Sequence, residues 1–158
     1  DTDRSRGLGD VYKRQNYLWG NPQGEEGLTA THQKSIYDPC PPGYRIPGKD
    51  AFSIFTKTGE NTTDPAQHNV VNTSPTKRGW YLYYAATGSG EQAWFPYNGC
   101  RYYSSGALNR GSFYYYWTSA PSAGTKSCCL AFKNDWKEVD PLYTFQRGNA
   151  QTIRCVKE

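Results

Sequence analysis

The sequence predicts an α+β domain built on a small, twisted, mainly antiparallel sheet. One short stretch with helical periodicity precedes several short stretches with strand periodicity, and this order is typical of α+β domains. Aromatic residues make up 16% of the 158 residues, and 16 glycines and 10 prolines interrupt the chain too often for a helical bundle. A chain of this length has room for one domain.

Residues 1–15 (DTDRSRGLGDVYKRQ) differ from the rest of the chain. They carry seven charges and no pattern that could bury one face of a helix or strand. They resemble the translated adapter read-through found at the ends of open reading frames in metagenome assemblies. We therefore expect a non-native or disordered leader, the alternative being a solvated natural linker. The predicted domain is residues 16–158.

Three kinds of segment are expected between residues 16 and 58. Residues 16–34 are rich in turn residues, with a short strand at 17–19. Residues 37–47 contain four prolines, which fix φ and remove hydrogen-bond donors, so we expect a rigid extended connector. Residues 48–58 form the only convincing helix, which ends before Gly59. Its apolar side chains recur at helical spacing: Ala51, Phe52, Ile54 and Phe55.

After a polar loop at residues 60–78, the apolar pattern changes to that of strands. Runs of aromatic and apolar residues alternate with turn clusters rich in glycine, serine and asparagine. We expect each run to form a strand. The runs are Trp80–Tyr84, Ala93–Phe95, Tyr114–Thr118, Cys129–Phe132 and Thr152–Val156.

Charge and hydropathy exclude two classes of partner. The net charge of +4 is spread out, and its longest basic runs are pairs, so we expect no nucleic-acid partner. The longest apolar stretch, Trp80–Ala86, has seven residues, whereas a membrane-spanning helix needs roughly 20. No transmembrane span is expected. Because the chain contains no methionine, we expect a fragment or a processed product, with room upstream for a signal peptide or a lipid anchor.

Metal and catalytic patterns are weak. The chain has only two histidines, His32 and His68, without the spacing of a zinc site. Carboxylates are scattered, and the glycine-rich pieces lack the lysine and the strand-to-helix context of a phosphate loop. The sequence therefore predicts no metal, no cofactor and no enzyme.

Four motifs, in this order, resemble the Fibrobacter succinogenes major paralogous domain of surface proteins and fimbrillin-like lipoproteins of Bacteroidetes. They are Tyr37–Pro47 (YDPCPPGYRIP), Tyr116–Ser119 (YWTS), Leu130 with Phe132, and Ile153–Val156 (IRCV). The resemblance covers roughly residues 16–158. It implies a C-type-lectin-like fold with one or two short helices, paired termini and long irregular loops that present a binding face. The calcium-binding triplets of C-type lectins are missing, so calcium-dependent sugar binding is not expected.

The same resemblance implies a disulfide between Cys40 and Cys155. Such a bridge would close a loop of more than 100 residues and stabilise the fold by about 4 to 5 kcal/mol. It implies an oxidising location, extracellular or on the outer cell surface. The alternative is two separate buried thiols. Strand alternation places Cys128 and Cys129 on opposite faces, so at most one of them could pair with Cys100.

The second half of the chain is rich in tyrosine, serine and asparagine, a composition typical of antibody-like binding surfaces. The alternative is that tyrosines fill half-buried strands, which we prefer for Tyr116 and Trp117. In a lectin-like fold the segments between the framework strands converge on one side. We therefore predict a ligand-binding face made of Tyr102, Tyr103, Asn109, Phe113, Tyr114, Asp135, Trp136 and Tyr143.

Two functions follow from these expectations. The first is a non-catalytic, secreted or surface-anchored recognition module that binds a protein or glycan on another cell, a host or a phage. The second is a structural or tip subunit of a surface appendage, which a long unpaired strand edge would favour. The family includes proteins that retroelements diversify at asparagine codons near the C-terminus, and the interspersed Tyr, Ser, Asn, Asp and Cys raise that hypothesis here.

Overall fold

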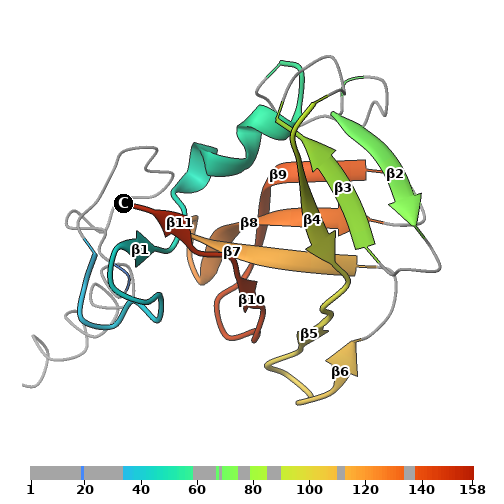
Figure 1. Ribbon diagram of the computed structural model, residues 1–158. Coiled ribbons are helices and arrows are strands. Elements are labelled where there is room, and N and C mark those ends of the chain that lie inside the picture. The colour runs from blue at the N-terminus through green and yellow to red at the C-terminus, as the bar shows by residue number, and fades with distance from the viewer. Residues whose placement is uncertain are drawn as a thin grey trace, which may run out of the picture.

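Two sheets of unequal size dominate the computed structural model of the protein (Figure 1). The larger sheet has the order β10-β7-β8-β9. Its long strands β7 (Phe113–Pro121), β8 (Lys126–Lys133) and β9 (Glu138–Gln146) are antiparallel, whereas β10 (Thr152–Ile153) runs parallel to β7. The structure describes Trp19, Gln67 and residues 34–58, 69–74, 79–84, 90–109, 113–133 and 138–158.

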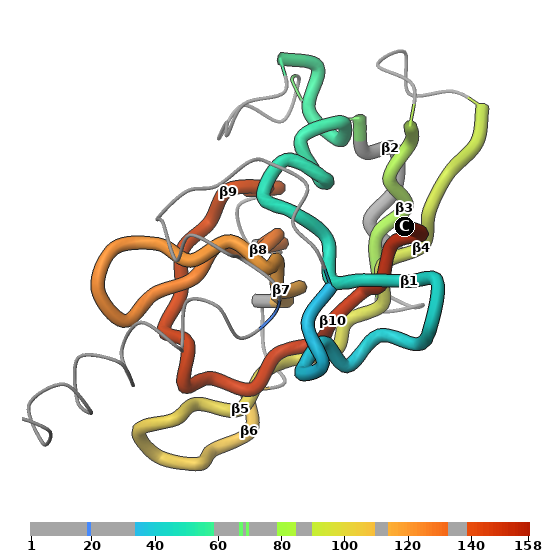
Figure 2. Tube along the Cα trace, turned by 90° about the vertical axis from the view of Figure 1, so that its left-hand side faces the viewer, coloured from blue at the N-terminus to red at the C-terminus, as the bar shows by residue number. Residues whose placement is uncertain are grey.

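The smaller sheet has three antiparallel strands in the order β2-β3-β4. These are β2 (Val70–Ser74), β3 (Gly79–Tyr83) and β4 (Gln92–Pro96). Figure 2 looks along the strands of the larger sheet and shows the smaller sheet on one side of it. A short hairpin of β5 (Cys100–Arg101) and β6 (Leu108–Asn109) lies near the β10 edge. With one helix and mostly antiparallel strands, the described residues fit the predicted α+β class.

The main hydrophobic core lies between the two sheets and the helix, and Phe95 of β4 is at its centre. The Phe95 ring lies 5.4 Å from Phe55, 5.2 Å from Tyr116 and 5.5 Å from Phe132, measured between ring centroids. These three rings belong to the helix, β7 and β8. The buried core consists of Phe52, Phe55, Trp80, Leu82, Ala93, Phe95, Tyr114, Tyr116, Leu130, Phe132 and Val139.

The predicted helix exists, but it is a 3-10 helix, η1 (Lys49–Phe55), which is shorter than the expected 48–58. A 3-10 helix has three residues per turn, so side chains at i and i+3 share one face. Phe52 and Phe55 are therefore both buried, whereas Ile54 is 48% exposed. The assignment of Ile54 to the buried face was wrong because it assumed the α-helical period.

Two of the longer strands were not predicted. Residues 70–74, assigned to a polar loop, form β2, and β9 was missed because Asp140-Pro141 is typical of a turn. In β9, residues 141 and 142 together oppose Leu130, since Asp140 pairs with Ala131 and Tyr143 with Cys129. This extra residue is a β-bulge on an edge strand, a position that tolerates proline. The expected strand 152–156 divides into β10 and β11 (Val156–Lys157).

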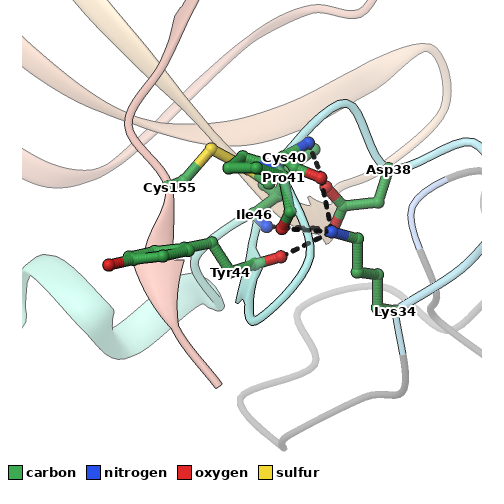
Figure 3. Close-up of a disulfide and its surroundings, with 7 residues drawn as sticks. All are labelled: Lys34, Asp38, Cys40, Pro41, Tyr44, Ile46 and Cys155. Atoms are coloured by element: carbon green, nitrogen blue, oxygen red, sulfur yellow. Dashed lines mark hydrogen bonds between the residues drawn. A yellow bond between two sulfur atoms is a disulfide. The ribbon is translucent and has the colours of Figure 1, made fainter.

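The two ends of the domain are joined by a strand pair and a disulfide. β1 (Tyr44–Arg45) pairs antiparallel with β11, and Cys40 is bonded to Cys155 with the two Cα atoms 5.8 Å apart (Figure 3). The predicted pairing of these two cysteines is thus seen in the structure. Of the predicted strand at residues 17–19, only Trp19 is described, and it lies in a turn. The predicted leader, residues 1–15, lies outside the described residues.

The proline-rich connector is a turn followed by β1 rather than an extended segment throughout. The Tyr44 amide donates to the Pro41 carbonyl (3.0 Å), and Gly43 between them has φ +78°, a conformation that favours glycine. The buried Asp38 carboxylate accepts hydrogen bonds from the amides of Cys40 (2.8 Å) and Ile46 (3.0 Å).

Lys34 holds the same turn from the other side, with its ammonium donating to the carbonyls of Cys40, Pro41 and Tyr44 (Figure 3). One cation thus gathers three carbonyl oxygens of the turn. The loop that carries Cys40 is therefore fixed by the side chains of both Lys34 and Asp38.

Arg154 ties the C-terminal end of the chain to the smaller sheet. Its guanidinium donates to the Trp94 carbonyl (2.6 Å) and lies 4.3 Å from the centroid of the Phe95 ring, a cation–π contact. The arginine of the IRCV motif therefore has a structural role between β10 and β11. It positions Cys155 next to the turn that carries Cys40.

Candidate functional site

The side of the larger sheet that faces away from the smaller sheet is also lined with aromatic rings. Successive residues of a strand point to opposite faces, so Tyr114 and Tyr116 of β7 enter the main core while Tyr115 and Trp117 point to the other side. There they join Cys129 and Ala131 of β8 and Cys100 of β5 in a second buried cluster. Partly buried rings from β9 and from the β5–β6 hairpin pack on this cluster. We call the surface formed by Tyr102, Tyr115, Trp117, Tyr143 and Phe145 the aromatic face.

Four rings of the aromatic face, those of Tyr102, Tyr115, Tyr143 and Phe145, contact one another. Tyr115 lies 4.8 Å from Phe145 with an interplanar angle of 16°, and 5.8 Å from Tyr143 with an angle of 24°. Tyr102 meets the edge of Phe145 at 6.3 Å. Tyr102, Tyr143 and Phe145 remain partly exposed over the buried Tyr115. The arrangement offers flat, rigid and partly solvated apolar surface, which suits binding because little side-chain entropy is lost on contact.

The β5–β6 hairpin closes one end of the aromatic face. The Asn109 amide donates to the Tyr102 hydroxyl (2.7 Å) and fixes that ring. The Tyr103 amide donates to the side-chain oxygen of the buried Asn149 (2.9 Å), while the Tyr103 ring is 62% exposed. Gly148 allows this approach, because a Cβ there would lie 2.9 Å from the Tyr103 Cβ. Tyr103 is therefore an exposed ring on a well-fixed backbone.

The predicted binding residues divide into three groups. Tyr102, Tyr103, Asn109 and Tyr143 are brought together at the aromatic face or its rim. Tyr114 was wrongly assigned to a binding face: it is 6% exposed, packs in the main core and stacks on Tyr97 at 3.8 Å. Phe113 is described only by its backbone in β7, and Asp135 and Trp136 lie outside the described residues.

The ligand-binding face predicted from the sequence did not include Tyr115 and Phe145, which complete the aromatic face. The available signal was alternation: Phe145 is two residues from Tyr143, so the two rings share one side of a strand. Alternation also places Tyr115 with Trp117 and opposite Tyr114. It could not be used for β9, because residues 138–146 were not recognised as a strand.

Three free thiols are buried, and two of them lie in the second cluster. Cys100 and Cys129 belong to the cluster beneath the aromatic face, and Cys128 is also buried. Cys129 and Cys100 share a cluster, as the alternation argument allowed, but they are not bonded to each other. Burial raises the pKa of the Cys129 thiol well above its ordinary value, and nearby Asp140 adds to this. Burial also raises the pKa of the Tyr115 hydroxyl.

These raised pKa values predict a loss of stability in alkali. In the folded state the thiols and phenols are held neutral, whereas in the unfolded chain they ionise from about pH 9 for cysteine and pH 10 for tyrosine. The contribution of these groups to the free energy of unfolding is therefore complete below about pH 9 and is lost as the pH rises beyond it. Each group lowers the free energy of unfolding by at most about 1.4 kcal/mol per pH unit. Urea unfolding at pH 7.5, 9 and 10.5 should show this decline.

The Cys129→Ala variant is the matched control for that titration, because it removes the most deeply buried thiol. Its free energy of unfolding should fall less steeply between pH 9 and 10.5 than that of the unsubstituted protein. Equal slopes for the two proteins would contradict the assignment to Cys129.

A comparison with protein-family models, curated protein sequences and solved structures finds no match for this chain. Among the described residues, no three His, Cys, Asp or Glu side chains are grouped as a metal site would require. Within the same part of the chain, no helix is long and apolar enough to span a membrane. The candidate site therefore rests on the geometry of the aromatic face.

Proposed function

We propose that this protein is a non-catalytic recognition module that binds a protein or glycan ligand on the aromatic face. The observation that carries the proposal is the stack of Tyr115 with Tyr143 and Phe145, in which partly exposed rings cover a buried one. Aromatic anchors of this kind usually supply most of the binding energy of an interface. The exposed Tyr103 and the Tyr102–Asn109 hydrogen bond add a polar rim at one end.

We also propose membership of the Fibrobacter succinogenes major paralogous domain family and a C-type-lectin-like fold. Three features support this: the pairing of β1 with β11, the bridge between Cys40 and Cys155, and, among the described residues, one short helix beside small, mostly antiparallel sheets. The disulfide fits an extracellular or outer-surface location, since such bonds persist in oxidising surroundings. The hypothesis of retroelement diversification would be tested by sequencing sibling genes, whose differences should cluster at rim positions such as Tyr103 and Asn109.

The alternative function is a structural or tip subunit of a surface appendage. The observation in its favour is β9, a strand of nine residues at the edge of the larger sheet. This edge is interrupted, however: Pro141 has no amide hydrogen, and the Leu142 amide donates to the Asp140 carboxylate (2.9 Å). Proline and bulges are devices that protect sheet edges against pairing. The edge therefore favours the recognition module over a donated strand.

The recognition proposal predicts that Tyr103→Ala and Tyr143→Ala weaken binding at least tenfold, because each removes a ring of the face or its rim. The probe is biotinylated protein on fluorescent streptavidin, titrated against a panel of bacterial and mammalian cells by flow cytometry. Circular dichroism melts verify that each variant folds.

Tyr37→Ala is the matched control, since Tyr37 is 65% exposed, close to the 62% of Tyr103, but lies in the turn beside the disulfide. It should bind like the unsubstituted protein. Binding to none of the cells, or binding that both face variants retain, would contradict the proposal.

A further inference from the structure

One residue from the N-terminal part of the chain packs against the cluster beneath the aromatic face. Trp19 is the only described residue before Lys34, and its side chain packs against the buried cluster beneath the face. This cluster includes Tyr115, Trp117 and Cys129. The contact therefore joins positions nearly 100 residues or more apart in the sequence. The Trp19 indole thus packs on the same side of the larger sheet as the surface to which we assign ligand binding.

We propose that the aromatic face accepts an aromatic side chain of a polypeptide ligand, and that Trp19 occupies this position in the free protein. The proposal rests on the binding function assigned above and deepens it. Trp19 would act both as a stand-in for the ligand and as a competitor that the ligand must displace.

The chemistry of the face fits an aromatic side chain better than a charged ligand. The described side chains that pack together on this side of the sheet, Tyr102, Tyr115, Trp117, Tyr143 and Phe145, are aromatic. Offset or edge-on contacts between rings are favourable. An indole or phenol has the flat shape and the single polar hydrogen that such surroundings can accept.

A glycan is the less favoured ligand. Sugars present many hydroxyl groups, and each one that is buried needs a hydrogen-bonding partner. At the described rim the two amide side chains each hold a tyrosine of the hairpin: Asn109 donates to the Tyr102 hydroxyl, and the Asn149 oxygen accepts from the Tyr103 amide. The side chain that already packs on this side of the sheet is the indole of Trp19, which carries one polar hydrogen and no hydroxyl group. The observations therefore favour a peptide segment with an exposed aromatic residue.

The covalent link determines how strongly Trp19 competes. Trp19 is only 15 residues before Lys34, which is anchored to the carbonyls of the Cys40 turn. Because Trp19 belongs to the same chain as the face, its packing is intramolecular, and a free peptide must compete with it. A free peptide at micromolar concentration should therefore bind poorly while Trp19 is in place. Removal of the Trp19 ring should raise the apparent affinity without changing the face itself.

The test uses the full chain and a fluorescein-labelled peptide NYLWGNP, the sequence of residues 16–22. Fluorescence anisotropy should show that Trp19→Ala binds this peptide at least tenfold more tightly than the unsubstituted protein. The peptide NYLAGNP should not bind. Adding Tyr143→Ala to Trp19→Ala should abolish the gain, because Tyr143 belongs to the face.

Trp94→Ala is the matched control for loss of an indole elsewhere. Trp94 is a partly buried tryptophan of β4, 4.6 Å from Tyr81, and it is outside the aromatic face. This variant should bind NYLWGNP no better than the unsubstituted protein. A gain equal to that of Trp19→Ala would overturn the proposal, because the peptide would then be responding to general exposure of apolar surface.

Three other results would overturn the proposal. Equal affinities for Trp19→Ala and the unsubstituted protein would show that Trp19 does not compete. Loss of folding in Trp19→Ala would make Trp19 a permanent part of the core. Binding of Trp19→Ala to spots of a glycan array, with no binding of the peptide, would assign the face to sugars.

The cell assay separates this proposal from the recognition function. If Tyr143→Ala loses binding to cells while Trp19→Ala binds them as the unsubstituted protein does, only the role of Trp19 is refuted and the recognition function stands.

Discussion

Replacing Cys40 and Cys155 together by serine should lower the free energy of unfolding by about 4 to 5 kcal/mol, the largest effect expected for this protein. The two residues are 115 apart in the sequence, and the bond removes the entropy that so long a loop has in the unfolded chain. The folded state is affected less than the unfolded state by the loss of the bond. β1 still pairs with β11, and Asp38 and Lys34 still hold the turn. Urea unfolding followed by tryptophan fluorescence measures the difference.

Reduction provides the control for this prediction. Treatment with a reductant should destabilise the unsubstituted protein to the level of the double variant and leave the double variant unchanged. If the double variant unfolds at the same urea concentration as the unsubstituted protein, the bond does not restrict the unfolded chain and the prediction is wrong.

Phe95→Ala should cost about 3 to 5 kcal/mol, the usual range for removal of a fully buried aromatic ring. Phe95 is 1% exposed and contacts rings of the helix, β7 and β8, so the cavity would open where the two sheets and the helix meet. It would also deprive the Arg154 guanidinium of its ring partner. The urea midpoint and the melting temperature should both fall.

Ile54→Ala is the control for this core substitution. Ile54 lies on the same helix as Phe55 but is 48% exposed, so its truncation should change the free energy of unfolding by no more than about 0.5 kcal/mol. Similar losses for Phe95→Ala and Ile54→Ala would show that the contacts described around Phe95 do not stabilise the fold.

Local sequence patterns identify well the strands that are unbroken runs of apolar and aromatic residues. β3, β4, β7 and β8 were predicted within a few residues, because each is a run of apolar and aromatic side chains between turn residues. β9 was missed, since its Asp140-Pro141 pair breaks the pattern at a bulge that only the pairing with β8 makes tolerable. The helix was placed correctly and Phe52 and Phe55 of its predicted apolar face are buried, but its 3-10 geometry and the exposure of Ile54 were not predicted.

The candidate site was predicted only in part, because its residues were selected by residue type. Tyr102, Tyr103, Asn109 and Tyr143 were selected by residue type, and they do come together. Tyr114 was selected by the same criterion and is in the main core. Residue type cannot separate these cases, because tyrosine serves equally well as a binding ring and as a half-polar core residue.

The sequence by itself determined that a short helix precedes several strands, the positions of four strands, and the alternation that sends Tyr115 and Trp117 to one side and Tyr114 and Tyr116 to the other. The disulfide was expected from a resemblance in motifs. Only the tertiary structure decided which side of β7 is covered by the smaller sheet and which carries the aromatic face. Both sides of this strand are aromatic, so local alternation is symmetric between them. What distinguishes them is the placement of β4 and its Phe95, through contacts between residues far apart in the chain.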